Sequence, residues 1–145
     1  MGGFPNSQGS DHVEVIKTKI ESSLTVLLVS NYEKSKKYYE DALGCEVNEF
    51  WAIRDNFGLG FKLIQATHIE DVRPNKGTWN TYAYIKNHAE LDALFIELKT
   101  NGAIIVSEPK ETAHDWGTWK DFSVQDLDGY VIGFGSGNKH NKGEE

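Results

Sequence analysis

The sequence contains a single cysteine, Cys45, among its 145 residues. One cysteine can form neither an intramolecular disulfide nor a cysteine-rich zinc site. Cys45 follows Gly44 at the start of an expected strand, which favours a buried structural thiol over a nucleophile. The lack of paired cysteines therefore predicts a protein of a reducing compartment, the cytoplasm.

Positive charge and long apolar segments are also scarce. Fifteen Lys and Arg stand against 22 Asp and Glu, a formal charge of -7. This balance opposes binding to phosphate backbones, so we expect no nucleic-acid partner. No apolar run approaches the length needed to cross a bilayer, so we expect a soluble protein with no membrane partner. The 39% hydrophobic and 12% aromatic fractions are typical of a folded globular chain.

The two ends of the chain show no periodic apolar pattern. Residues 1–22 are predicted to be a flexible lead-in that lacks the basic start and apolar centre of a signal peptide. Residues 138–145 are predicted to be a polar tail. Residues 23–137 are expected to form one domain, built of modules at about 23–67 and 78–137.

The first module reads as a strand, a helix and two further strands. "SLTVLLVS" predicts a buried strand, and "NYEKSKKYYEDALG" predicts a helix with Asn31 as its N-cap and Gly44 as its C-terminal cap. "CEVNEFWAI" and "LGFKLIQA" predict strands on either side of the turn "RDNFG". One additional short strand in this region is an open alternative.

The second module repeats this order. "TWNTYAYIK" predicts a strand, "NHAELDALFIELKTNG" a helix that stops at Gly102, and "AIIVSEP" a strand that ends at Pro109. "TWKDFSVQD" and "YVIGFGSG" are expected to pair through the turn Asp128-Gly129. Two βαβββ-like units predict an α+β fold, in which each unit supplies half of the sheet structure and covers its outer face with a helix.

Three of these segments resemble a known superfamily. "LTVLLVSNYEKSKKYYEDALGCEV", "TYAYIKNHAELDALFIELKTNGAIIV" and "DFSVQDLDGYVIGF" are similar to the vicinal oxygen chelate superfamily, which includes glyoxalase I, extradiol dioxygenases and bleomycin-resistance proteins. The resemblance implies paired βαβββ modules that form a curved, cup-shaped mixed sheet. In that superfamily the cup holds a divalent metal bound by His, Gln or Glu. The resemblance does not specify an activity, because the superfamily contains isomerases, epimerases, dioxygenases, transferases and drug-sequestering proteins.

The resemblance places the four metal-ligand positions at Leu24, Lys62, Asn80 and Gly133. Leu24 offers no lone pair, and the ammonium of Lys62 repels a cation. The amide of Asn80 is a weak ligand. Gly133 stands where the superfamily has a glutamate, after a turn that here reads "DLDG". The resemblance therefore implies a protein closest to the metal-free bleomycin-resistance-like branch, without metal and without another cofactor.

Strand alternation then predicts what fills the cup instead of a metal. Tyr82 and Tyr84 share the face of Asn80, and Trp119 and Asp121 are expected on the concave side of the last hairpin. Aromatic walls with a few polar groups suit a planar or amphiphilic ligand, and the acidic balance favours a cationic one. The predicted ligand-binding residues are Leu24, Val26, Lys62, Asn80, Tyr82, Tyr84, Trp116, Trp119, Asp121 and Gly133.

Structural interpretations of these residues stay open beside the functional ones. Trp51 and Trp79 are also expected in ordinary packing or in a dimer contact, and Tyr82 and Tyr84 in a filled second core. Lys62 is also expected in an ion pair with a carboxylate.

Two other groups of residues are considered for chemistry. "THIED" and "AHDW" together offer two histidines and two carboxylates, either as a displaced metal site or acid–base pair or as solvated loop residues. The glycine-rich "GFGSG" does not open a helix, so no phosphate site is expected there.

Two classes of function follow from the sequence. One is a metal-independent protein that sequesters a small planar aromatic or amphiphilic compound. The other is a lyase or isomerase of the same superfamily that works without metal or with non-standard ligands, using His114, Asp121 or Lys62. The loss of ligand chemistry at all four positions favours the first class. The resemblance also implies a two-fold homodimer whose ligand lies between the subunits.

Overall fold

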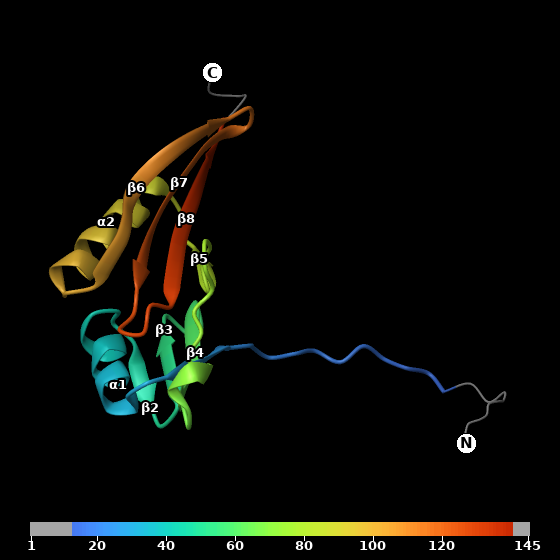
Figure 1. Cartoon of the computed structure of the whole chain (residues 1–145). Helices are drawn as coiled ribbons and strands as arrows, with labels where there is room; N and C mark the ends of the chain where they lie inside the picture. The colour runs from blue at the N-terminus through green and yellow to red at the C-terminus, as the bar shows by residue number, and fades with distance from the viewer. Residues whose placement is uncertain (1–12, 141–145) are drawn as a thin grey trace.

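The computed structural model describes residues 13–140 and shows two copies of one βαβββ unit (Figure 1). The first unit consists of β1 (Thr25–Val29), α1 (Tyr32–Asp41), β2 (Glu46–Asn48), β3 (Trp51–Arg54) and β4 (Leu59–Gln65). A short 3-10 helix, Ile69–Asp71, lies between the units. The second unit consists of β5 (Thr81–Tyr84), α2 (His88–Thr100), β6 (Ile104–His114), β7 (Gly117–Gln125) and β8 (Val131–Lys139).

Each unit forms a four-stranded mixed sheet with the same topology. The strand orders are β1-β4-β3-β2 and β5-β8-β7-β6. The first strand of each unit pairs in parallel with the last, and the remaining pairs are antiparallel. Both helices lie on the same side of the sheets in Figure 1. The α+β fold of paired βαβββ modules predicted from the sequence is confirmed.

Both helices begin and end where the sequence predicts. The side chain of Asn31 accepts a hydrogen bond from the backbone N–H of Lys34, at 3.0 Å, and Asn87 does the same for Glu90 at 2.8 Å. These bonds satisfy backbone donors that have no partner within the first helical turn. Gly102 adopts a φ of +96° after α2, in the left-handed region that favours glycine.

The core lies between each helix and its sheet. Side chains alternate along a strand, so one face of β1 buries Leu27 and Val29 while Val26 on the other face is exposed. In the second unit Phe122 and Val124 of β7 are buried in the same way, as predicted. Both sheets therefore have an outer face covered by a helix and an inner face that no helix covers.

Hydrogen bonds join the two units at two places, on the helix side of the sheets and between their first strands, β1 and β5. The hydroxyl of Tyr38 donates to the backbone oxygen of Gln125 at 2.6 Å, and Tyr39 donates to the carboxylate of Asp126 at 2.7 Å. The side-chain oxygens of Thr25 and Thr81, which hold equivalent places in β1 and β5, lie 2.5 Å apart. The units thus meet at equivalent strands, which brings their inner faces next to each other.

Two sequence predictions about strands need correction. β6 does not end at Pro109 but continues to His114. Pro109 falls within the register shift between Ser107 and Lys110 of the β6–β7 pairing, on the edge strand of its sheet, where a missing backbone N–H removes no needed ladder bond. The segment "CEVNEFWAI" forms two strands, because Glu49 turns the chain with a φ of +57°. The additional short strand left open above is therefore present.

The segments outside the two units are only partly described. Residues 1–12 and 141–145 of the predicted lead-in and tail lie outside the described residues. Residues 13–24 are extended, and Val13, Val15, Ile16 and Ile20 are 79–87% exposed. Among residues 13–140, neither helix has the length and apolar composition that crossing a bilayer requires.

Candidate functional site

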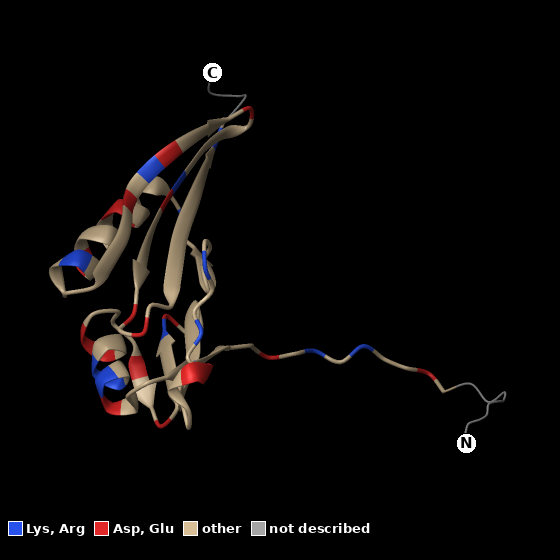
Figure 2. Cartoon of the chain, in the orientation of Figure 1, with Lys and Arg blue, Asp and Glu red and all other residues tan. Residues whose placement is uncertain are grey.

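Three glycines alternate along β8 on the inner face of the second sheet. Gly133, Gly135 and Gly137 are separated by Phe134 and Ser136, which are buried toward α2. The alternation leaves a strip of bare backbone on the inner face. β8 also carries no charged residue before its last position, Lys139 (Figure 2).

Aromatic rings lie directly on this strip. Register places Tyr82 of β5 beside Gly133 and Trp119 of β7 beside Gly137. A Cβ atom at Gly133 would lie 2.5 Å from Cδ1 of Trp79 and 2.6 Å from Cδ1 of Tyr82. At Gly135 it would overlap Tyr82 and Trp119. The glycines are therefore what allows these rings to approach the sheet.

The rings contact one another and form an aromatic cluster, defined here as Trp79, Tyr82, Tyr84 and Trp119. Tyr82 stacks on Trp119, with centroids 6.4 Å apart and planes at 22°. Trp79 meets Tyr82 edge to face at 4.6 Å, and Tyr84 meets both Tyr82 and Trp119 edge to face at 5.5 and 6.0 Å. Such offset and T-shaped pairs are the favoured geometries of aromatic rings.

A short chain of hydrogen bonds fixes the centre of the cluster. Nε1 of Trp119 donates to the hydroxyl of Tyr82 at 2.9 Å, and this hydroxyl donates to Oδ2 of Asp121 at 3.0 Å. Burial raises the pKa of Tyr82 to about 12, and the bond to Asp121 adds to the effect. Tyr82 is therefore a neutral donor at physiological pH. Within the described chain, Oδ1 of Asp121 has no hydrogen-bond partner and Asp121 makes no ion pair, which leaves a carboxylate oxygen for a ligand.

The cluster is an open surface and not an enclosed cavity. Tyr84 is 77% exposed and Trp79 is 43% exposed. Trp116, at the tip of the β6–β7 hairpin, is also 43% exposed and stacks on His114 at 5.1 Å with planes at 5°. Tyr82 and Trp119 are half-buried. The rings thus offer faces to a planar molecule while their own positions are held by the strands beneath.

The inner face of the first sheet carries the other predicted residues. Val26 is 61% exposed and pairs in register with Lys62, which lies between Val26 and Trp51. Leu24 covers Gly60, where an added Cβ would lie 2.6 Å from its Cδ2. The structure shows no ion pair of Lys62 with any described carboxylate, so the predicted pairing is wrong for residues 13–140.

Asn80 has a structural role that the sequence did not indicate. Its Oδ1 accepts a hydrogen bond from the backbone N–H of Val131 at 3.0 Å, and its own N–H donates to the oxygen of Val131 at 2.7 Å. These bonds extend the pairing of β5 and β8 by one residue. The side chain of Asn80 therefore fixes the backbone of β8 at Val131, two residues before the first glycine of the strip.

The four positions of the superfamily's metal ligands do not fit a metal. The space beside Gly133 is occupied by Trp79 and Tyr82, and the oxygen of Asn80 already binds the backbone. Leu24 and Lys62 supply no donor for a cation. Residues 13–140 also contain no group of three or more His, Cys, Asp or Glu arranged to hold an ion.

The remaining candidates for chemistry are not brought together. Nδ1 of His68 and Oε1 of Glu70 lie 3.9 Å apart at the short 3-10 helix between the units, and both side chains are about 70% exposed. Among residues 13–140, no hydrogen bond or ion pair links them to His114 or Asp115. Cys45 is 5% exposed, and burial raises its pKa to about 12, so its thiol is a structural group as predicted.

Sequence reasoning missed the part played by Gly135 and Gly137. The signal was present in "GFGSG", where glycine recurs at every second residue of a strand. The sequence also does not decide between packing and binding for Trp79, because its loop has no periodicity that fixes where the indole lies.

The fold and the site define a class: paired βαβββ modules whose inner face carries an aromatic surface. The family model of the Glyoxalase/Bleomycin resistance protein/Dioxygenase superfamily matches residues 11–134, and the chain belongs to this superfamily. A comparison with curated proteins returned no match.

Solved structures share this fold. A glyoxalase/bleomycin resistance protein/dioxygenase from Alicyclobacillus acidocaldarius is similar with a TM-score of 0.64 and 12% identity, over 84% of this chain and 93% of that one. One from Nocardioides has a TM-score of 0.58 and 15% identity, over 88% and 91%. A hypothetical protein from S. aureus has a TM-score of 0.56 and 25% identity, over 82% and 95%.

Proposed function

We propose that this protein is a metal-independent binding protein that sequesters a planar aromatic or amphiphilic compound with a positive charge. The observation that carries this proposal is the aromatic cluster resting on the glycines of β8, with exposed ring faces on Tyr84 and Trp79. Rings that are already held in place lose little conformational freedom on binding, which favours affinity. The free oxygen of Asp121 beside them favours a cation over an anion.

The binding experiment uses two planar probes of similar size and opposite charge, proflavine and anthracene-9-carboxylate. Titration calorimetry on the full chain should show proflavine binding more tightly. Tyr84→Ala should weaken proflavine by about 1–2 kcal/mol, because this exposed ring can be removed without disturbing the core. Asp121→Asn should reduce the preference for proflavine while leaving anthracene-9-carboxylate within a factor of about two.

Ile96→Ala is the matched control for both variants. Ile96 is 59% exposed on α2, the helix that covers the opposite face of the sheet. Its loss should leave both probes unaffected. Equal affinity for the two probes in the unchanged protein, or insensitivity to Tyr84→Ala, would contradict the proposal. Turnover of a substrate that is abolished by changing His114, Asp121 or Lys62 would support the lyase or isomerase instead.

A homodimer in the cytoplasm is the proposed setting of this function. In the single chain, the inner faces of the two sheets expose large apolar side chains to solvent, among them Val26, Trp51 and Tyr84. A second copy of the chain offers the same surfaces, which suits a two-fold contact. Sedimentation at tens of micromolar should show a dimer. A monomer at that concentration would contradict both the dimer and any ligand site shared across it.

A further inference from the structure

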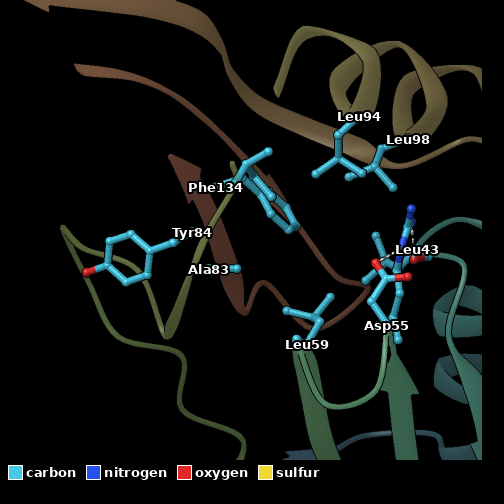
Figure 3. Close-up of a pocket in the computed structure, with 11 residues that line it drawn as sticks. Leu43, Asp55, Leu59, Ala83, Tyr84, Leu94, Leu98 and Phe134 are labelled. Atoms are coloured by element: carbon cyan, nitrogen blue, oxygen red, sulfur yellow. Dashed lines mark hydrogen bonds and ion pairs between the residues drawn. The ribbon is translucent and has the colours of Figure 1, made fainter. Parts of the chain in front are cut away.

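A cavity of about 160 Å³ lies between the two units, on the helix side of the second sheet (Figure 3). We call it the inter-unit cavity. Its apolar walls are formed by Leu43 and Leu59 of the first unit and Ala83, Leu94, Leu98 and Phe134 of the second. Tyr84 borders it, but its ring points away from the other lining side chains (Figure 3) and contacts Tyr82 and Trp119 of the aromatic cluster. The cavity and the aromatic cluster therefore lie on opposite faces of the same sheet.

One end of the inter-unit cavity is polar and its charge is set by four residues. The guanidinium of Arg54 donates to both carboxylate oxygens of Glu97, at 2.7 and 2.8 Å, and its Nε donates to Asp55 at 3.1 Å. An adjoining hollow shares Asp55 and Leu94 with the cavity and adds Glu90. Two carboxylates thus bind the guanidinium and a third, Glu90, lies in the adjoining hollow, so these four residues together carry a net negative charge.

The wall at the polar end is held in an unusual backbone conformation. Asp55, Asn56 and Phe57 have φ values of +54°, +51° and +71°, three successive residues other than glycine in the left-handed region. Each such residue is disfavoured relative to ordinary backbone, and such conformations gather at ligand sites. The turn places the carboxylate of Asp55 beside the cavity, with its side chain 78% exposed and accessible from solvent.

We propose that the inter-unit cavity binds a single-ring aromatic or short-chain apolar compound that carries a positively charged amino group. Apolar cavities of about 150 Å³ in proteins stay dry and accept benzene, so one ring fits the volume observed. The apolar walls contact the ring, and the acidic end receives the ammonium. Binding here would also fix the distance between the two units, since residues of both line the cavity.

The probes are benzylamine, toluene and benzoate, which share one ring and differ in charge. Calorimetry and thermal unfolding of the full chain at millimolar probe concentrations should rank benzylamine first, toluene second and benzoate last. Asp55→Asn should weaken benzylamine about threefold and leave toluene unchanged, since a solvent-exposed charge pair contributes little more than this. Asparagine also tolerates the left-handed conformation, so this variant should fold.

Two filling variants test the location. Ala83→Leu and Leu94→Phe each place extra volume in the inter-unit cavity from a different element, and each should weaken benzylamine and toluene more than tenfold. Either one alone suffices if the other fails to fold. Ile96→Ala, which changes an exposed position on the same helix as Leu94, should leave both probes unaffected.

The opposite results overturn the inference. Absence of any shift in melting temperature with all three probes shows that the cavity does not accept a ring. Binding that survives both filling variants, or that is lost with Trp119→Ala instead, shows that the probes bind the aromatic cluster. Benzoate binding as tightly as benzylamine would contradict the assignment of charge. These outcomes are independent of whether proflavine binds the aromatic cluster.

Discussion

Gly133→Ala is the most direct test of the aromatic cluster, because it adds one methyl group beneath two rings. The new Cβ would lie 2.5 Å from Cδ1 of Trp79 and 2.6 Å from its Nε1 and from Cδ1 of Tyr82. Carbon atoms pack at about 3.5–4.0 Å, so both rings must move by about 1 Å. The φ of Gly133 lies outside the left-handed region, so the backbone itself accepts alanine.

The magnitude follows from two opposing effects. Inserting a methyl group into packed surroundings costs about 1–3 kcal/mol. Trp79 is 43% exposed and can swing outward, which puts the cost in the lower half of this range. Replacing glycine by alanine reduces the conformational entropy of the unfolded chain, which raises the free energy of unfolding by about 0.4–1 kcal/mol. The expected net loss in the free energy of unfolding is therefore about 1 kcal/mol, with a marked change in the near-ultraviolet circular dichroism of the tryptophans.

Gly137→Ala is the matched control on the same strand and the same face. There the added Cβ would lie 3.4 Å from Trp119 and 3.6 Å from Trp116, close to ordinary contact. Urea unfolding of this variant should show unchanged or slightly increased stability, and its near-ultraviolet spectrum should match that of the parent protein. Equal stability of the two variants, with unchanged spectra in both, would refute the placement of Trp79 and Tyr82 on Gly133.

Three further predictions concern the contacts that hold the units and the cluster. Arg54→Ala should lower the free energy of unfolding by about 1.5–3 kcal/mol in urea titrations, since Arg54 is only 20% exposed and binds Glu97 of the other unit. Arg54→Lys should recover little of this free energy, because an ammonium cannot donate to both carboxylate oxygens as the guanidinium does. The ultraviolet absorbance of tyrosinate, titrated in the parent protein and in Tyr82→Phe, should differ by one ionisation with a midpoint at a pH of about 12. The free energy of unfolding of the parent protein should fall as the pH rises from about 10, where an unfolded tyrosine ionises, through the folded pKa of Tyr82, and Tyr82→Phe should lack this contribution to the fall. Asp126→Ala should lower the free energy of unfolding by about 2–4 kcal/mol in the same urea assay, because the 1% exposed carboxylate accepts hydrogen bonds from the Tyr39 hydroxyl and from two backbone N–H groups. Asp126→Asn should lower it clearly less, because the amide oxygen of asparagine can still accept from the backbone N–H groups.

Local signals in the sequence predicted the elements well, because the contacts that form them are close along the chain. Asn31 and Asn87 each cap a helix through a residue three positions away, and a chain of 10–20 residues already contains that information. The turn at Asp128-Gly129 sets the register in which Gln125 faces Val131. Alternation within β7 then assigned Phe122 to the buried face.

The contacts between the two units could not be predicted from such local signals in the sequence. Arg54 and Glu97 are 43 positions apart, and Thr25 and Thr81 are 56 apart. Nothing in either local segment indicates the partner, because both residues of each pair suit a solvent-exposed strand or helix equally well. The same limit applies to Trp79, whose ring position depends on the bare backbone of a strand more than fifty residues later in the chain. Pro109 misled the prediction of β6, since its cost depends on whether the strand lies at an edge.

The aromatic cluster and a metal centre of the superfamily type exclude each other for a steric reason. A glutamate at position 133 needs the volume that Trp79 and Tyr82 now fill, and a metal-binding group at position 80 would break the bond from Asn80 to the backbone of Val131. Restoring one ligand therefore disturbs the cluster without completing a site.

Gly133→Glu should accordingly weaken proflavine, because the new side chain displaces the rings that the probe contacts. It should gain no thermal stability from nickel, zinc, manganese or iron, since Leu24, Lys62 and Asn80 still provide no adequate set of donors. The unchanged protein should likewise show no shift with these metals, measured by thermal unfolding at micromolar metal. A metal that binds the folded state must raise its melting temperature by mass action, so a clear increase with any one of them in the unchanged protein would overturn the metal-independent interpretation.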